Sequence, residues 1–146
     1  MADHAITPEA LVEQERRFAD AFAAKDLEIV RPLYDPAVVY VSPTVRLFDW
    51  PARIEGVDRT LEFIGLTIRN VEDVRYEAVE TAVTPPGDAA FVRIHFDWTA
   101  GARRLRSSYV VIYRYRGGRI ARQELYYDPS GRLEELDPPV GSRRGP

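Results

Sequence analysis

The sequence of 146 residues contains no cysteine and only two histidines, His4 and His95. The absence of cysteine excludes disulfide bonds, a thiol nucleophile and thiolate-bound metals, and it is typical of a cytoplasmic protein. Two histidines do not make a histidine-rich metal site, so we expect no metal of that kind. No apolar run approaches the length of a membrane-spanning helix, and the N-terminus has no basic segment followed by an apolar stretch. The sequence therefore predicts no targeting signal and no membrane partner.

An excess of charge of one sign is also lacking. The net charge is −3, and Lys and Arg are scattered among acidic residues. The sequence therefore lacks the clustered basic residues that nucleic-acid-binding proteins have, and we expect no nucleic-acid partner. Apolar residues make up 45% of the chain and charged residues 29%, as is ordinary for a globular protein. At this length we expect one domain with a substantial core.

The stretch 103–128 predicts a β-hairpin that turns at Gly117-Gly118. Val, Ile and Tyr are frequent in both arms, and a pair of glycines accepts the positive φ angles of a tight turn. Because successive side chains of a strand point to opposite sides, the first arm has apolar residues on both faces. We therefore expect this strand to lie centrally in its sheet, with helices on one face and a second subunit on the other.

The remaining elements follow from hydrophobic periodicity and from helix start and stop signals. The pattern predicts helices at 8–25, 26–34 and 56–69, and further strands at 37–42, 73–84 and 89–99. Residues 44–55 have no clear period and are interpreted as a loop, and the composition after residue 128 favours an unpacked tail. This order predicts an α+β fold, a cone-shaped, curled antiparallel β-sheet wrapped around a long N-terminal helix and two shorter helices.

Three stretches carry a family resemblance: FADAFAAKDLEIVRPLYDPAVVYVSP, Gly56 with the acid that follows it, and YRYRGGRIARQELYYDPSG. In these stretches the chain resembles the nuclear transport factor 2-like superfamily, in its SnoaL-like and ketosteroid isomerase-like branch. The resemblance implies one SnoaL-like domain at 1–131 and a loose tail at 132–146. Because this fold holds isomerases, polyketide cyclases, dehydratases, epoxide hydrolases and non-catalytic members, it implies the fold and leaves the chemistry open.

The catalytic positions of the known enzymes are changed in this chain. A ketosteroid isomerase has a tyrosine, an aspartate base and an acidic oxyanion-hole residue where this chain has Phe18, Ser42 and Val111. A limonene-epoxide hydrolase has its base aspartate at the position matched to Leu125. Neither mechanism is available in the form that the family uses.

The strand at 91–98 decides which residues face the inside of the cone, because apolar and polar side chains alternate strictly along it. The apolar set is Val92, Ile94, Phe96 and Trp98, and the polar set is Arg93, His95 and Asp97. Burying each apolar side chain contributes about 1.5–3 kcal/mol, whereas burying an unpaired ion costs several kcal/mol. We therefore place the apolar set inside, as an isomerase-like alignment does; an epoxide-hydrolase-like alignment gives the opposite register.

With this register, aromatic and neutral polar side chains line the interior. The residues expected to contact a ligand are Phe18, Phe22, Ser42, Trp50, Phe96, Trp98, Val111, Gln123, Leu125 and Tyr127. Such a lining suits a flat, hydrophobic small molecule with a few oxygens. Two alternatives remain open: the aromatic residues could fill the cone as ordinary core, and Trp50 could be a lid on that core.

The opposite face of the sheet predicts a partner surface. Val110, Ile112 and Tyr126 lie there among charged residues, and an apolar centre with mixed charges around it is typical of a two-fold interface. We therefore expect a homodimer through the convex sheet face, with a solvated face as the alternative.

Glu15 is the most informative residue for catalysis, because it falls within the apolar stripe of the first helix. Desolvation would raise the pKa of its carboxyl group, as a general acid or base requires. Our hypothesis is that Glu15 moves a proton while Tyr40 or Tyr109 donates a hydrogen bond to a developing oxyanion. The alternative is that Glu15 pairs with an arginine such as Arg103 or Arg106.

His95 is the other catalytic candidate, because it titrates near neutral pH and has Asp97 on the same strand face. Such a pair on an outer face is more often part of an interface. The predicted function is a cofactor-independent isomerase, cyclase or dehydratase that transfers a proton on a hydrophobic, carbonyl-bearing substrate. The alternative is a non-catalytic member of the fold that binds a small ligand or a protein partner.

Overall fold

Two α-helices and a seven-stranded sheet form the fold in the computed structural model, which describes residues 5–128 and 133–136. The helices are α1 (Pro8–Ala24) and α2 (Val57–Ile68), with short 3₁₀-helices η2 (Leu27–Ile29), η3 (Arg31–Leu33) and η4 (Pro43–Phe48). The strands are β1 (Tyr34–Val41), β2 (Arg53–Glu55), β3 (Glu72–Val83), β4 (Ala89–Ala100), β5 (Arg103–Arg116), β6 (Arg119–Tyr127) and β7 (Glu134–Leu136). The predicted α+β cone is confirmed.

Helix α1 begins and ends where the sequence predicts. The Thr7 side chain accepts a hydrogen bond from the backbone N–H of Ala10 at 3.1 Å, and Pro8 occupies the first turn. The helix ends at Lys25, whose φ of 53° is left-handed and lets its backbone N–H return to the last turn. These two ends fix α1 as a rigid element that packs against β3.

The prediction of one short helix at 26–34 is wrong in type. The segment instead forms the two 3₁₀ turns η2 and η3, and β1 begins directly after them at Tyr34. Pro32 lies in the second turn, where it has no N–H to donate and would clash with the preceding turn of an α-helix. The first strand therefore starts three residues earlier than the predicted Ala37.

The interpretation of 44–55 as a loop is also wrong. Ser42 caps η4, because its side chain accepts a hydrogen bond from the backbone N–H of Thr44 at 3.3 Å. β2 then pairs antiparallel with β1, with Ile54 opposite Tyr40. A strand of three residues is too short to show a period in the sequence.

The sheet has the strand order β2-β1-β6-β5-β4-β3. The short strand β7 is not part of this order and pairs with β5. All of its pairs are antiparallel except β1 with β6, which run parallel and place Tyr40 opposite Gln123. β5 is central, as predicted, because β4 flanks it on one side and β6 on the other.

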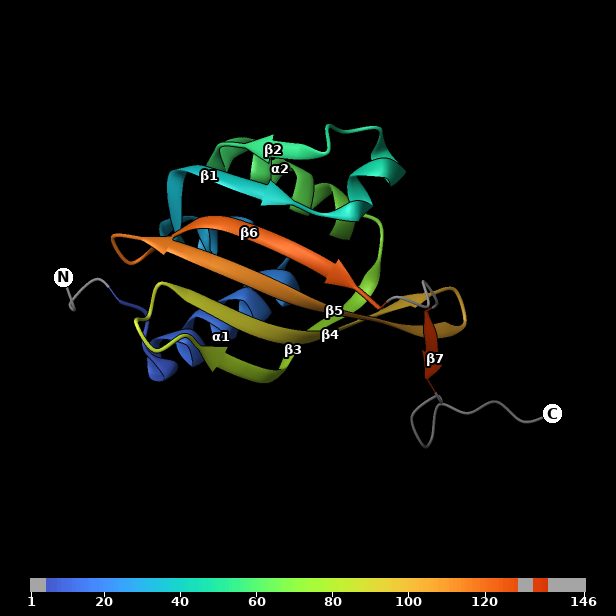
Figure 1. Ribbon diagram of the computed structural model, residues 1–146. Coiled ribbons are helices and arrows are strands. Elements are labelled where there is room, and N and C mark those ends of the chain that lie inside the picture. Colours follow the sequence, from blue (N-terminus) through green and yellow to red (C-terminus); the bar gives the residue numbers. More distant parts are fainter. Residues whose placement is uncertain (1–4, 129–132, 137–146) are drawn as a thin grey trace.

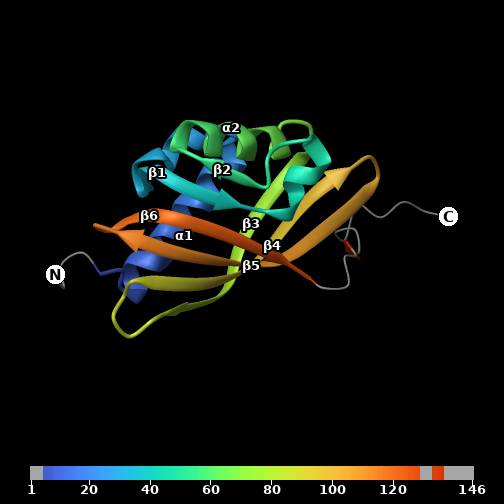
Figure 2. The same cartoon turned by 45° about the horizontal axis from the view of Figure 1, so that its top comes forward.

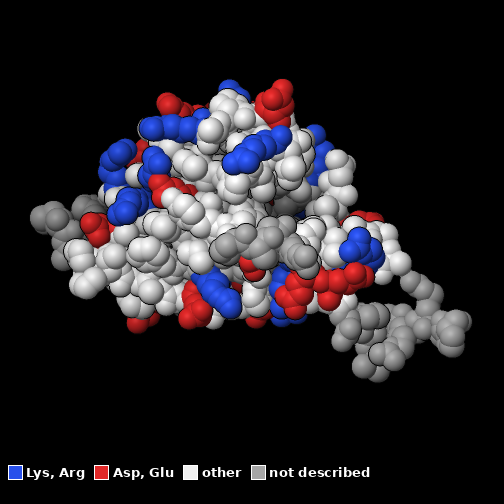
Figure 3. Space-filling model, turned by 45° about the vertical axis from the view of Figure 1, so that its right-hand side comes forward, with Lys and Arg blue, Asp and Glu red and all other residues white. Residues whose placement is uncertain are grey.

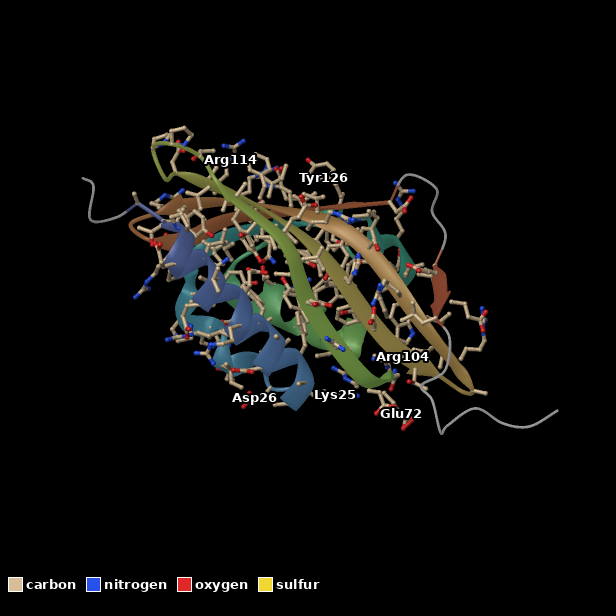
Figure 4. The ribbon with its side chains drawn as sticks, turned by 90° about the horizontal axis from the view of Figure 1, so that it is seen from below. Lys25, Asp26, Glu72, Arg104, Arg114 and Tyr126 are labelled. Atoms are coloured by element: carbon tan, nitrogen blue, oxygen red, sulfur yellow. The ribbon has the colours of Figure 1, made fainter. Side chains whose placement is uncertain are left out.

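Both α-helices lie on the same side of the curled sheet (Figures 1 and 2). α1 packs against β3 at one edge of the sheet, whereas α2 packs against β1 and β2 at the other edge. Tyr126 and Arg114 project from the opposite side of the sheet (Figure 4). Both α-helices therefore lie on the concave face of the curled sheet, and the convex face is the one away from them.

The predicted register of β4 is confirmed. Val92 and Ile94 are fully buried against the helices, whereas Arg93 is exposed on the outer face. Asp97 also lies on the outer face but is only 5% exposed, since Arg106 on β5 donates two hydrogen bonds to its carboxylate at 2.8 and 3.0 Å. The epoxide-hydrolase-like register is therefore excluded.

Part of the predicted loose tail is paired. β7 runs antiparallel to the start of β5, with Glu134 opposite Arg106 and Leu136 opposite Arg104. Arg103 and Glu135 form an ion pair at 3.2 Å. The other residues of the predicted tail, 132 and 137–146, lie outside the described residues.

Charges of both signs are interspersed on the surface. On the face in Figure 3, the described Lys and Arg side chains lie among Asp and Glu, and neither sign forms a broad patch there. No helix within residues 5–128 and 133–136 is long and apolar enough to cross a membrane.

Candidate functional site

A cavity of about 330 Å³ opens on the concave face between α1, α2, η4 and strands β1, β3, β4, β5 and β6. Its lining is aromatic and aliphatic, with a few hydroxyl groups and one amide. The residues are Phe18, Phe22, Tyr40, Thr44, Leu47, Phe48, Ile64, Thr67, Val71, Tyr76, Phe96, Trp98, Ser107, Tyr109, Val111, Gln123, Leu125, Tyr127 and Leu133. All of these side chains are neutral, and the volume is that of a small-molecule site.

Most of the predicted contact residues line this cavity. They are Phe18, Phe22, Phe96, Trp98, Val111, Gln123, Leu125 and Tyr127, and the two predicted oxyanion donors, Tyr40 and Tyr109, line the cavity as well. Strand alternation places those on β4, β5 and β6, because the residues that face the helices lie next to one another on adjacent strands.

Trp50 and Ser42 lie outside this lining. The Trp50 ring packs on Phe63 with ring centroids 5.2 Å apart, and the Arg59 guanidinium lies 4.7 Å from its centroid, so Trp50 is a lid on the core. Ser42 is buried behind the wall, and its hydroxyl oxygen lies 2.8 Å from that of Thr44, which does face the cavity.

His95 is placed away from the cavity. It is half-buried on the outer face of β4, opposite Ser108 of β5 and Glu77 of β3. The neighbouring Asp97 is occupied by Arg106. His95 is therefore not in position to exchange a proton with a molecule in the cavity.

Glu15 lies inside the protein behind the cavity wall, and only 4% of it is exposed. Its carboxylate accepts hydrogen bonds from the hydroxyl of Tyr76 at 2.5 Å, the hydroxyl of Tyr113 at 2.9 Å and the side-chain amide of Gln14 at 3.0 Å. Tyr115 in turn donates to Gln14 at 3.0 Å. The partners are thus neutral tyrosines and an amide, and the alternative of an arginine partner is wrong.

Burial dominates the electrostatics of this cluster. Desolvation raises the pKa of the Glu15 carboxyl above its ordinary value of 4.5, although the donors Tyr76, Gln14 and Tyr113 act in the opposite direction. Burial also raises the pKa of Tyr76 and of Tyr113 well above 10, and the nearby Glu15 adds to both shifts. Both phenols are therefore neutral donors at ordinary pH.

Tyr76 joins the buried carboxyl group to the cavity. It lines the cavity, its ring packs on Phe22 with centroids 4.9 Å apart, and its hydroxyl reaches Glu15. The sequence analysis missed this residue. The alternation of Val74, Tyr76 and Ala78 with charged residues along β3 is the signal that could have found it.

Gln123 is held in one orientation by a second buried tyrosine. Tyr34 donates a hydrogen bond from its hydroxyl to the Gln123 Oε1 atom at 2.6 Å. Because the carbonyl oxygen is used in this way, the amide nitrogen is the group left for a molecule in the cavity. Gln123 can therefore act as a hydrogen-bond donor there.

Three tyrosine hydroxyls complete the polar part of the lining. Burial raises the pKa of Tyr127 to about 12 and raises the pKa of Tyr40 and Tyr109 further, so all three are neutral. The Tyr109 and Tyr127 rings pack together with centroids 4.8 Å apart. Within the part of the chain that the structure describes, the Tyr109 hydroxyl has no hydrogen-bond partner, so it can donate to a ligand.

A metal site is not formed by the described residues, among which no group of three His, Asp or Glu side chains could hold an ion. The chemistry available to the cavity is therefore that of neutral hydrogen-bond donors, aromatic surfaces and one buried carboxyl group behind Tyr76.

Comparison with known proteins agrees with this architecture. The family model described as SnoaL-like domain matches residues 16–123. No curated protein matches the chain in sequence. Among solved structures, a putative isomerase from Bacillus subtilis superposes with a TM-score of 0.67 at 22% identity, covering 82% of this chain and 86% of that chain.

Two further structures carry names of different activities. A putative polyketide cyclase from Sinorhizobium meliloti has a TM-score of 0.61 at 22% identity, over 83% of this chain and all of its own. An epoxide hydrolase of the LEH-like type from M. tuberculosis has a TM-score of 0.61 at 18% identity, over 80% and 81% of the two chains. At these identities the likeness shows the fold alone.

Proposed function

The chain belongs to the SnoaL-like domain family, and from this premise we propose that it is a cofactor-independent enzyme that transfers a proton on a hydrophobic, carbonyl-bearing small molecule. The reaction class is isomerisation, cyclisation or dehydration. The observation that carries the proposal is the contact between Glu15 and Tyr76 at the wall of an otherwise neutral cavity.

This contact supplies what proton transfer needs. Glu15 has neutral partners and a raised pKa, so its protonated and ionised forms are closer in free energy at neutral pH than those of an exposed glutamate. Tyr76 separates it from the cavity. In the proposed step, a proton leaves the carbon next to the substrate carbonyl for the Tyr76 oxygen as the phenolic proton of Tyr76 passes to Glu15. The reverse movement returns a proton to the product.

The developing negative charge on the carbonyl oxygen requires donors. The Tyr109 hydroxyl and the Gln123 side-chain amide lie on neighbouring strands of the same wall, and Tyr34 holds the amide in place. Neutral donors in a site of low dielectric constant stabilise an oxyanion without reorganising solvent. In this assignment Glu15 and Tyr76 move the proton, and Tyr109 and Gln123 bind the oxygen.

The test uses 2-tetralone, a flat, hydrophobic ketone whose α protons exchange with solvent through its enolate. The exchange of these protons in D₂O is followed by ¹H NMR with the protein and without it. We expect the protein to accelerate exchange and both Glu15→Gln and Tyr76→Phe to abolish the acceleration. Glu13→Gln and Tyr126→Phe are the controls, because Glu13 pairs with Arg16, Tyr126 is 55% exposed and neither side chain lines the cavity.

A second function is favoured by one observation, the neutrality of the whole cavity lining. A member of the fold that only binds a ligand needs no titratable group in contact with it. If calorimetry shows that 2-tetralone binds while its exchange is no faster than in buffer, the binding function replaces the catalytic one.

We also propose that the convex face of the sheet packs against a second copy of the chain. Phe91 and Tyr126 are exposed there, 40% and 55% respectively, and they lie opposite Ile112 and Val110 on β5. Figure 4 places Tyr126 on the side away from α1. An apolar strip surrounded by charges is the pattern of a two-fold interface.

A further inference from the structure

A second cavity, of about 320 Å³, adjoins the first. The two cavities share five lining residues, Thr44, Leu47, Ser107, Tyr127 and Leu133. Because the same side chains line both, the two cavities lie next to each other.

The junction between the cavities is apolar and exposed. Leu47 is 77% exposed and Leu133 is 52% exposed, and each lines both cavities. Covering the apolar surface of exposed leucines favours binding, because it removes that surface from water. A ligand that spans the junction would cover both side chains.

The two cavities differ in charge. The first is lined by neutral side chains, whereas the second also contains Arg46 and Asp128. Asp128 already takes part in an interaction. Among the ion pairs formed by residues 5–128 and 133–136, none includes Arg46, so its guanidinium is available to a ligand. Arg46 and Leu47 are neighbours on η4, next to the apolar junction.

We infer that the second cavity binds the carboxylate end of an elongated ligand, whose flat hydrophobic part occupies the first cavity. Arg46 is the residue that recognises this carboxylate, and the hydroxyls of Thr44, Ser107 and Ser108 are the neutral donors around it. The inference rests on the proposed function, because it names the class of molecule that the same site takes. The substrate class is thus an aromatic or polycyclic carbonyl compound with an acidic side chain.

The test compares 4-(2-naphthyl)butanoic acid with its methyl ester by calorimetry at low salt. The two probes have the same ring and chain and differ in the charge at the end. We expect the acid to bind about two- to fivefold more tightly than the ester, the range of a partly exposed ion pair. The preference should disappear in Arg46→Gln and should shrink as salt is added.

Arg119→Gln is the matched control, because Arg119 is also an exposed arginine but lies at the opposite end of β6 from Tyr127. It should keep the preference for the acid. The inference is overturned if the acid and the ester bind equally to the unmodified protein, or if the preference for the acid persists in Arg46→Gln.

A third probe separates this inference from the proposed function. The neutral molecule 2-naphthol needs only the first cavity, so its binding does not depend on Arg46. If 2-naphthol binds and the acid has no advantage over the ester, the inference fails while the proposed ligand class stands. If neither 2-naphthol nor the acid binds, both are contradicted.

Discussion

Substitution of Glu15 by glutamine should change the pH dependence of stability in a defined direction. Burial raises the pKa of Glu15 in the folded protein above its ordinary value of 4.5. The folded state therefore favours the protonated form more than the unfolded chain does. The stability that this group contributes is present below about pH 4.5 and is lost as the pH rises through the folded pKa. The amide in Glu15→Gln does not titrate, so this part of the pH dependence disappears in the variant.

The size of the effect follows from linkage. Between the unfolded and the folded pKa, one proton is bound by the folded state and not by the unfolded state. The free energy of unfolding of the unmodified protein therefore falls, relative to Glu15→Gln, by at most about 1.4 kcal/mol per pH unit. At acid pH the free energy of unfolding of Glu15→Gln is lower than that of the unmodified protein by about 1–3 kcal/mol. The reason is that one of the donors Tyr76, Tyr113 and Gln14 loses its acceptor.

Urea unfolding at intervals between pH 4 and pH 8 measures this difference. The expected result is that Glu15→Gln is the less stable protein at pH 4 and that the gap closes as the pH rises. Glu13→Gln is the control on the same helix, because Arg16 lowers the pKa of Glu13, and there the sign is opposite. The raised pKa of Glu15 is refuted if the free energies of unfolding of Glu15→Gln and of the unmodified protein change in parallel with pH. It is also refuted if the difference between them widens as the pH rises.

Three other predictions concern the fold and its partner. Asp97→Ala leaves the half-buried Arg106 without its two acceptors and should lower the free energy of unfolding by about 1–3 kcal/mol in thermal denaturation; no loss would mean that water replaces the pair. Gly87→Ala should destabilise by more than Gly117→Ala in urea, since both have positive φ but only the first Cβ would meet another atom, at 2.6 Å; equal losses would contradict this. Val110→Glu should convert the proposed dimer to a monomer in analytical ultracentrifugation, whereas a sedimentation coefficient unchanged from that of the unmodified protein would show that the convex face is not the interface.

The periodic parts of the fold could be predicted from the sequence. α1, α2 and strands β3 to β6 repeat their pattern over enough residues for periodicity and caps to define them. The concave face of β4 followed from the cost of burying ions. Short elements could not be predicted, because the three residues of β2 and the turns around Pro32 are too short to show a periodic pattern.

The site could be predicted only in part, for a related reason. Its aromatic wall follows from strand alternation, and the burial of Glu15 follows from its place in the stripe of α1. The partners of Glu15 do not, because Tyr76 and Tyr113 lie 61 and 98 residues away in the chain. The same holds for the pairing of Tyr34 with Gln123. Contacts of this kind depend on how the sheet curls over the helix.

The parallel pairing of β1 with β6 determines when the molecule can be completed during synthesis. β1 leaves the ribosome early, yet its neighbour in the sheet begins only at Arg119. Until then β1 and α2 have no strand to join them to β3, β4 and β5, because β6 is the connection between the two halves of the sheet. Contacts between segments far apart in the sequence form slowly, and the apolar surface that they cover stays exposed until they form. The nascent chain therefore depends on its last long strand to acquire both its cavity and a closed core.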